Sequence, residues 1–262
     1  MPAPPPAPPL APVLGLGLLS IGKPWGFRRR AVPPYEAAAA LLEAAFELGI
    51  RHFDTAASYG DGEEKLGRFL RGRAGAGDVT VATKFGEHWD AEAGAPFVDH
   101  SYEALARSLD RSLERLGRID LLQVHKASPE VLRSPELQRA LDHARAAGVG
   151  RFGASVSSPE AGAAALACGW VQALQFPFNQ GHTAFAGVID AARERGVAVV
   201  INRPFGEGRL LYDDGGRARE GEALSGLLRF VAERVGPATI LVGTASIDHL
   251  RADVEAFRRA VR

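Results

Sequence analysis

The chain has 262 residues, of which 46% are hydrophobic, and its formal net charge is +0. This length suits one large α/β domain, and the balanced charge gives no reason to expect nucleic acid or an anionic membrane surface as a partner. No apolar run approaches the roughly 20 residues that a membrane span needs. The single cysteine, Cys168, excludes an intrachain disulfide, so we expect a cytoplasmic protein.

The first twelve residues, MPAPPPAPPLAP, are rich in proline and lack both the basic start and the apolar core of a secretion signal. We therefore predict a disordered tail over 1–12 and a single barrel domain over 13–262. Arg28, Arg29 and Arg30 form a short basic cluster that is typical of a solvated loop.

Strands and helices alternate along the rest of the chain. We expect strands at 13–22 (a strand or a hairpin), 50–53, 79–83, 119–124, 150–155, 171–176, 197–202 and 239–242. We expect helices at 35–48, 62–70, 101–116, 134–147, 158–168, 182–195, 222–235 and 246–260. The connections are too long for hairpins, so the sheet should be parallel. Eight strand–helix units of this kind predict a (β/α)8 TIM barrel, an α/β fold, rather than an open sheet.

Three expected strands end on an ionisable residue: Asp54, Lys84 and His125, with Tyr59 five residues after Asp54. Such residues suit the mouth of a barrel, where the strand ends converge. Taken singly, Asp54 fits a turn or a helix cap, Tyr59 a packed loop residue and His125 a satisfied histidine. Lys84 is harder to explain in this way, because its ammonium follows a buried strand and needs a partner such as Asp54.

Taken together, these residues predict proton transfer. A lysine ammonium near a phenol lowers the tyrosine pKa from about 10. Asp54 would hold Lys84 charged, while His125 would hydrogen-bond a substrate carbonyl or share the proton relay. No side chain donates hydride, so protonation of a carbonyl oxygen implies a nicotinamide cofactor.

The second half of the chain offers a place for that cofactor. Barrels commonly bind phosphate with the loops after strands seven and eight and a helix N-terminus. Here those loops are RPFGEGRL (203–210), within a long polar loop at 203–221, and GTAS (243–246). Glycines also end ordinary loops, so this signal is weak alone. No GxGxxG follows a strand, which argues against a Rossmann-type site.

The sequence resembles the aldo-keto reductase family over nearly all of 13–260. The most specific part is FDTAASYGDGEEKLGRFL (53–70), and VATKFG and IDLLQVHKAS match the lysine and histidine strands of the family. RFGASV, VQALQFPFN, NRPFGEGRL and ILVGTASIDHLRADVEA follow in the family's order. The resemblance implies Tyr59 as the general acid, Lys84 and Asp54 as the residues that adjust its pKa, and His125 as the residue that orients the substrate.

The resemblance also implies a set of cofactor contacts: Ser155, Gln175, Asn202, Arg203, Pro204, Phe205, Gly208, Leu210, Gly243, Thr244, Ser246, His249 and Asp253. Val156 replaces an asparagine of the family, and Asn202 stands where an aromatic residue often stacks on the nicotinamide. Gly243, His249 and Asp253 align with positions that often carry Lys, Arg and Asn in members that prefer NADPH. Arg203, Arg209 or Arg251 could substitute, and we expect NADP(H) rather than NAD(H).

The chain stops at its last barrel helix, so we expect a pocket more open than in relatives with a C-terminal substrate loop. Candidate wall residues are Trp25, Phe27, Phe85, Trp89 and Phe178, although packing alone also explains each of them.

The resulting hypothesis is an NAD(P)H-dependent oxidoreductase that interconverts an aldehyde or ketone and an alcohol. The expected partner is a small carbonyl or alcohol substrate, with no nucleic acid, membrane or metal, in a monomer or weak oligomer. Two alternatives stay open: an NAD-dependent aldose dehydrogenase on the same scaffold, and a non-catalytic cofactor-binding sensor or regulatory barrel.

Overall fold

The computed structural model describes residues 11–25, 31–90 and 92–262. Most of the tail that we predicted over 1–12 lies outside the described residues, and so do Phe27 and the Arg28–Arg30 cluster.

Eight parallel strands form a closed barrel, in the ring order β1-β10-β9-β8-β7-β6-β3-β2. Their bounds are β1 (Val13–Gly17), β2 (His52–Asp54), β3 (Thr80–Phe85), β6 (Leu121–Val124), β7 (Phe152–Ser155), β8 (Ala173–Pro177), β9 (Ala198–Asn202) and β10 (Ala238–Val242). The ring closes because β1 pairs in parallel with both β10 and β2. The predicted (β/α)8 TIM barrel is therefore confirmed.

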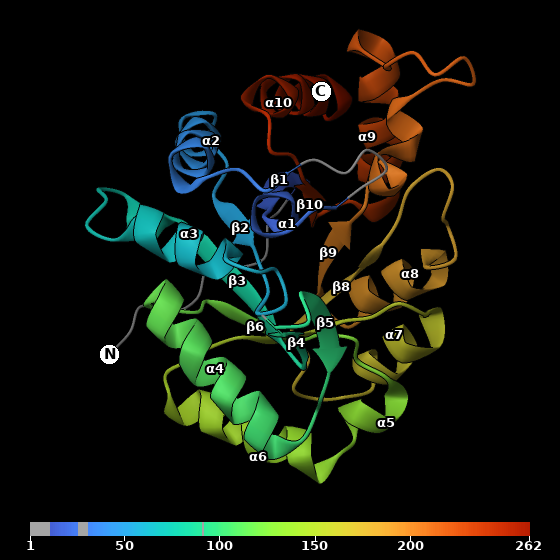
Figure 1. Ribbon diagram of the computed structural model, residues 1–262. Coiled ribbons are helices and arrows are strands. Elements are labelled where there is room, and N and C mark those ends of the chain that lie inside the picture. The colour runs from blue at the N-terminus through green and yellow to red at the C-terminus, as the bar shows by residue number, and fades with distance from the viewer. Residues whose placement is uncertain (1–10, 26–30, 91) are drawn as a thin grey trace.

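Helices surround the barrel on its outer side (Figure 1). They are α1 (Leu19–Gly22), α2 (Tyr35–Glu47), α3 (Gly62–Leu70), α4 (Tyr102–Leu116), α5 (Pro129–Leu132), α6 (Pro135–Ala146), α7 (Pro159–Leu166), α8 (Ala186–Glu194), α9 (Gly221–Val235) and α10 (Ile247–Ala260), with 3-10 turns at η1 (Ala76–Asp78) and η2 (Gly206–Leu211). Local sequence fixes several of their starts. The hydroxyls of Ser134, Ser158 and Ser246 accept hydrogen bonds from the first turns of α6, α7 and α10. Such caps each stabilise a helix by about 1 kcal/mol.

The structure differs from the prediction in several places, including the short helix α5 and the 3-10 turns η1 and η2, which were not predicted. Of the two alternatives for 13–22, the strand is confirmed over Val13–Gly17, and the rest of the segment contains the short helix α1 instead of a second strand. The helix predicted at 182–195 begins only at Ala186, because Asn179 and His182 pair with each other in a tight turn. A hairpin of β4 (Glu87–Asp90) and β5 (Ala95–Val98) was not predicted at all.

The loop that carries Tyr59 lies directly against α1, where two glycines allow the contact. A Cβ on Gly22 would lie 1.8 Å from the backbone oxygen of Tyr59, and one on Gly60 would lie 2.2 Å from the backbone oxygen of Gly22. Gly60 also has a positive φ of 57°, which favours glycine. This close approach fixes the loop on which Tyr59 stands.

We expect Gly22→Ala to destabilise the protein by about 1–3 kcal/mol, because the added methyl has no room beside rigid backbone. The measurement is the free energy of unfolding in urea. Gly226→Ala in α9 is the matched control, since a Cβ there meets nothing within 4 Å and should stabilise the helix by roughly 0.5–1 kcal/mol. Equal effects of the two substitutions would contradict the proposed contact.

His52, the first residue of β2, gives the protein a pH-dependent stability. Burial lowers its pKa to about 4, against the opposing charge of Asp54. Its Nε2 is buried and has no hydrogen-bond partner in the described part of the chain. An unfolded chain therefore binds a proton near pH 6.5 that the folded protein does not accept until about pH 4. Stability from this group is complete above pH 6.5 and is lost as the pH falls toward 4.

Between pH 7 and pH 5 this single group should cost about 2 kcal/mol of stability. We expect His52→Gln to remove that part of the pH dependence in urea unfolding measured at both pH values. His143→Gln is the control, because His143 lies on the surface with Nε2 3.1 Å from Asp110. If the free energy of unfolding fell as much between pH 7 and pH 5 in His52→Gln as in the wild type, His52 would not be the source of this pH dependence.

Candidate active site

The strand ends bring the predicted acid–base residues together at one rim of the barrel. Asp54 ends β2, Lys84 lies near the end of β3, and His125 directly follows β6. The parallel register places Lys84 opposite Gln123, two residues before His125. Tyr59 reaches the same rim from the turn between β2 and α3.

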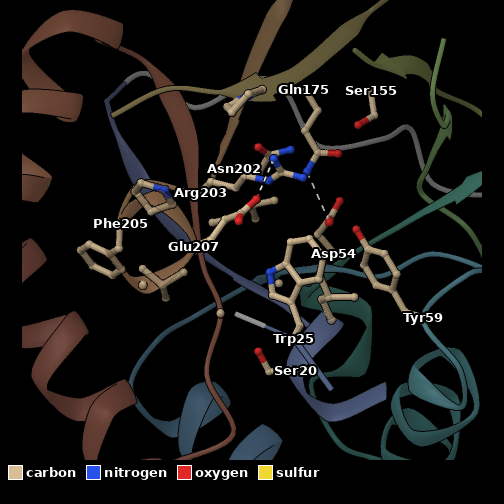
Figure 2. A pocket seen from close by; sticks show the side chains of 18 of the residues that line it. Ser20, Trp25, Asp54, Tyr59, Ser155, Gln175, Asn202, Arg203, Phe205 and Glu207 are labelled. Atoms are coloured by element: carbon tan, nitrogen blue, oxygen red, sulfur yellow. Dashed lines mark hydrogen bonds and ion pairs between the residues drawn. The ribbon is translucent and has the colours of Figure 1, made fainter. Parts of the chain in front are cut away.

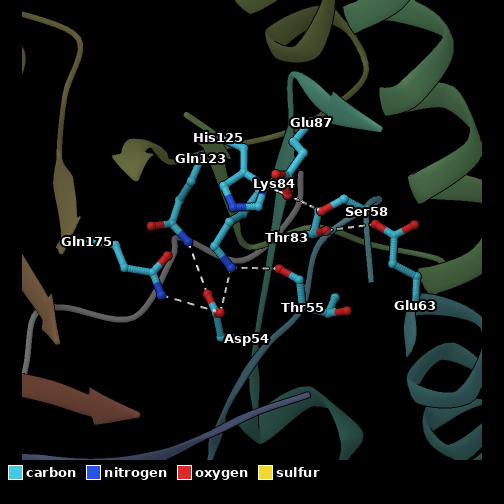
Figure 3. Close-up of polar contacts among 10 residues, drawn as sticks. All are labelled: Asp54, Thr55, Ser58, Glu63, Thr83, Lys84, Glu87, Gln123, His125 and Gln175. Atoms are coloured by element: carbon cyan, nitrogen blue, oxygen red, sulfur yellow. Dashed lines mark hydrogen bonds and ion pairs between the residues drawn. The ribbon is translucent and has the colours of Figure 1, made fainter. Parts of the chain in front are cut away.

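Asp54 and Lys84 form a buried ion pair at the centre of a hydrogen-bond cluster (Figure 3). Lys84 Nζ donates to Asp54 Oδ1 at 2.5 Å and to the backbone oxygen of Thr55 at 2.8 Å. Two amides also donate to the carboxylate: Gln123 Nε2 to Oδ2 at 3.1 Å, and Gln175 Nε2 to Oδ1 at 3.3 Å. Asp54 is 2% exposed and Lys84 1% exposed, so the cluster holds the lysine in one place.

This arrangement keeps Lys84 charged beneath Tyr59. Its Nζ lies 5.1 Å from the centroid of the Tyr59 ring. Burial alone would lower the pKa of Lys84, but the Asp54 carboxylate and Tyr59 outweigh it and raise that pKa above 10.5. An ammonium therefore lies beside the phenol at neutral pH.

The pKa of Tyr59 is raised above 10, because burial of the phenol outweighs the charge of Lys84. The expectation of a lowered pKa is wrong for this state of the protein. Lys84 does lower the pKa, as expected, but a sequence does not show how deeply the phenol is buried. The consequence is a phenol that keeps its proton at neutral pH and can donate it.

His125 lies edge-on to Tyr59, with ring centroids 6.0 Å apart. Burial, with further effects from Lys84 and Lys126, lowers its pKa well below 6.5, so the imidazole is neutral at neutral pH. Its Nδ1 lies 3.3 Å from Glu87 Oε2. A neutral imidazole at this position can orient a carbonyl by hydrogen bonding.

Sequence reasoning missed Glu87 and Gln123. Glu87 is buried, accepts a hydrogen bond from Ser58 Oγ at 2.6 Å and lies 3.6 Å from Lys126 Nζ. Nothing in the local pattern marks it, since it stands in the unpredicted hairpin. Gln123 did leave a signal, because it is the one polar residue in the apolar run LLQV and shares a strand face with His125.

A cavity of about 600 Å³ opens beside this cluster (Figure 2). Asp54, Tyr59 and His125 line it, whereas Lys84 lies beneath them. Ten of the predicted cofactor contacts also line it: Ser155, Gln175, Asn202, Arg203, Pro204, Phe205, Gly208, Gly243, Thr244 and His249.

The other three predicted contacts do not line the cavity. Leu210 packs against the hydrophobic core, and Ser246 caps α10 through the backbone N–H of His249. Asp253 is buried within α10, where desolvation raises its pKa to about 7. Direct cofactor contact by these three residues stays a prediction.

The unpaired polar groups of the cavity fit a nicotinamide carboxamide. Gln175 Oε1 and Asn202 Oδ1 are buried oxygens without a hydrogen-bond partner among the described residues. Buried acceptors of this kind need a donor, and an amide NH2 supplies two. Ser155 lies 7% exposed on the same wall and adds a hydroxyl.

Arg203 stands at the edge of the cavity in a strained backbone conformation, with a φ of 54°. Its guanidinium lies 2.9 Å from Glu207 Oε1 and 5.5 Å from the centroid of the Trp25 ring. Arg203 is therefore available to an anionic group only in competition with Glu207.

Fold and site together define a (β/α)8 barrel with a buried cluster of ionisable residues at the carboxyl ends of its strands, where barrel enzymes carry their active sites. Residues 13–227 match the model of the Aldo/keto reductase family. The chain belongs to that family.

Individual relatives agree with this assignment. Over 207 residues the chain is 28% identical to the aldo-keto reductase yakc of Schizosaccharomyces pombe, named with NADP(+), covering 76% of this chain and 59% of the relative. Over 238 residues it is 30% identical to the L-glyceraldehyde 3-phosphate reductase of Escherichia coli O157:H7, covering 82% of this chain and 67% of the relative. A solved Pseudomonas aeruginosa structure, assigned to the aldo-keto reductases, has a TM-score of 0.79 at 28% identity, covering 95% and 90% of the two chains.

The chain spans between 51% and 59% of the length of three curated relatives that it matches. Within the described ranges, no helix has the length and apolar character to cross a membrane. Across the same ranges, no group of three or more His, Cys, Asp or Glu residues is placed to hold a metal ion.

Proposed function

We propose that this protein is an NAD(P)H-dependent oxidoreductase that interconverts an aldehyde or ketone and an alcohol. The observation that carries the proposal is the Lys84 ammonium, fixed by Asp54 at 2.5 Å and lying 5.1 Å from the Tyr59 ring centroid. A buried charge held this firmly beside a phenol is costly to a core and useful to proton transfer.

Tyr59 is the general acid in this proposal. Its neutral phenol donates a hydrogen bond to the substrate carbonyl oxygen and transfers the proton as that oxygen gains negative charge. The Lys84 ammonium then stabilises the phenolate that remains. His125 hydrogen-bonds the same carbonyl oxygen, while Asp54 holds Lys84 in position and is itself held by hydrogen bonds from Gln123 and Gln175. Oxidation of an alcohol uses the same groups in reverse.

A nicotinamide dinucleotide, when bound, supplies or accepts the hydride. Ser155, Gln175 and Asn202 would hold its carboxamide, and the loops at 203–211 and 243–246 would lie along the rest of it. We propose NADP(H) over NAD(H), supported by Arg203 and His249 at the cavity and by the naming of the S. pombe relative with NADP(+).

One observation favours an NAD-dependent aldose dehydrogenase as a second candidate. Glu207 pairs with Arg203 at 2.9 Å and competes with a 2′-phosphate for that guanidinium. Comparison of the two nucleotides therefore tests both candidates.

The experiment measures NADPH and NADH oxidation against a panel of aldehydes, ketones and aldoses, and the reverse reaction with alcohols and aldoses. We expect reduction of aldehydes with NADPH. Aldose oxidation with NAD+ and little reduction would favour the dehydrogenase. Cofactor binding without any turnover would favour a non-catalytic barrel and overturn the proposal. We also propose a cytoplasmic monomer or weak oligomer, which fractionation and size-exclusion chromatography test.

A further inference from the structure

Lysine gathers around the active-site cavity and is nearly absent elsewhere. The chain has 31 Lys+Arg residues, of which only Lys23, Lys65, Lys84 and Lys126 are lysine. Lys84 lies beneath Tyr59, and both Lys23 and Lys126 line the cavity. Arginine serves as the cation over the rest of the protein, so the two cavity lysines invite a functional explanation.

Two of these three ammonium groups have a carboxylate partner. Lys84 pairs with Asp54 at 2.5 Å, and Lys126 Nζ lies 3.6 Å from Glu87 Oε1. Lys126 also holds a positive φ of 53°, a conformation that costs a non-glycine residue energy. With His125 neutral, the pairs Lys84–Asp54 and Lys126–Glu87 cancel in charge.

Lys23 is left uncompensated. Among the described residues, no carboxylate lies within 4.0 Å of its Nζ, although Glu87 is near enough to raise its pKa against the larger, lowering effect of burial. Its Nζ lies 5.7 Å from the ring centroid of Tyr59 and 5.6 Å from that of Trp89. The ammonium is therefore partly desolvated, bordered by two aromatic rings, and close to the phenol that faces the substrate.

We propose that the substrate carries an anionic group, a carboxylate or a phosphate monoester, within a few bonds of its carbonyl, and that Lys23 binds this group with Lys126 as the second cation. The inference rests on the proposed function and specifies its substrate class. Binding of an anion pairs the Lys23 ammonium, whereas a neutral substrate would bury that ammonium further without a partner.

The test compares kcat/KM within two matched substrate pairs: 4-oxobutanoate with butanal, and glyceraldehyde 3-phosphate with glyceraldehyde. We expect the wild-type protein to prefer the anionic member of at least one pair by about tenfold or more, the effect of one charged hydrogen bond. The preferred pair distinguishes a carboxylate from a phosphate.

The readout in variants is the preference ratio, anionic over neutral, rather than activity on either substrate. Lys23→Met should lower that ratio about tenfold, and Lys23→Arg should retain part of it because the charge remains. Arg217→Gln is the matched control, since it removes a positive charge from a side chain that is 86% exposed and does not line the cavity. Equal losses on both members in Lys23→Met, or no wild-type preference in either pair, would overturn the inference.

A binding measurement separates this inference from the proposed function. Trp25 lines the cavity and Trp89 borders Lys23, so tryptophan fluorescence can report succinate or glycerol 3-phosphate binding without turnover. Binding that Lys23→Met weakens about tenfold, in a protein with no turnover, would support the anion site and reject the oxidoreductase. Turnover of neutral carbonyls without binding of either anion would support the oxidoreductase and reject the anion site.

Discussion

Replacing Tyr59 with phenylalanine is expected to lower kcat/KM for carbonyl reduction by about 100- to 10,000-fold, the usual contribution of a general acid. The benzyl ring preserves the edge contact with His125 and the contacts with Lys23 and Lys84. The change removes only the phenolic hydroxyl, so cofactor affinity should stay within a few fold. Steady-state kinetics and fluorescence titration of the nicotinamide cofactor measure the two effects.

Tyr102→Phe on α4 provides the control, because Tyr102 packs against Arg139 and His143 on the outer side of the barrel. It should leave kcat/KM unchanged. If Tyr59→Phe kept more than about a tenth of the wild-type kcat/KM, Tyr59 would not be the acid.

Lys84→Met should abolish reduction and also destabilise the protein by about 3–5 kcal/mol, because it leaves the Asp54 carboxylate buried without its cation. Gln123 and Gln175 still donate to Asp54, but neither carries a charge. Urea unfolding measures the stability, and NAD(P)H oxidation measures the activity.

The double variant Lys84→Met with Asp54→Asn separates the two roles of the lysine. Removing both charges should recover much of the stability, whereas activity should stay absent because the buried Lys84 ammonium that stabilises the phenolate is gone. Lys65→Met offers a comparison at the other buried lysine, which donates to the backbone oxygens of Ile21 and Pro33. It should lower stability but leave reduction by the folded protein within a few fold. A fully active Lys84→Met would contradict the proposed proton chemistry.

Much of the barrel was predictable because apolar residues recur at regular spacing along its helices and strands, and glycines mark where several helices end. The helix at 62–70 was predicted with the bounds that α3 has, and Gly117 and Gly148 follow the ends of α4 and α6. The hairpin of β4 and β5 was not predicted, because both strands are only 4 residues long and Pro96 stands within the second. The late start of α8 depends on the pairing of Asn179 with His182. No periodicity of the sequence indicates that contact.

The site was predictable where topology alone decides position. Asp54, Lys84 and His125 meet because parallel strands of a barrel bring their carboxyl ends to one rim. Glu87 and Lys23 reach the cavity from a hairpin and from the end of a short helix, and neither position follows from strand order. The pKa of Tyr59 was misjudged for a similar reason, since the charge of Lys84 is visible in a sequence and the depth of a pocket is not.

The two sides of the cavity come from separate arcs of the ring. Three of the four predicted acid–base residues, Asp54, Lys84 and His125, belong to β2, β3 and the end of β6, whereas Ser155, Gln175 and Asn202 belong to β7, β8 and β9. Recombination with the gene of a relative at a point between α6 and β7 would therefore exchange all the residues of one side of the cavity together. Gln175 donates across that junction to Asp54 Oδ1 at 3.3 Å, so the activity of recombinants should depend on which residue stands at position 175.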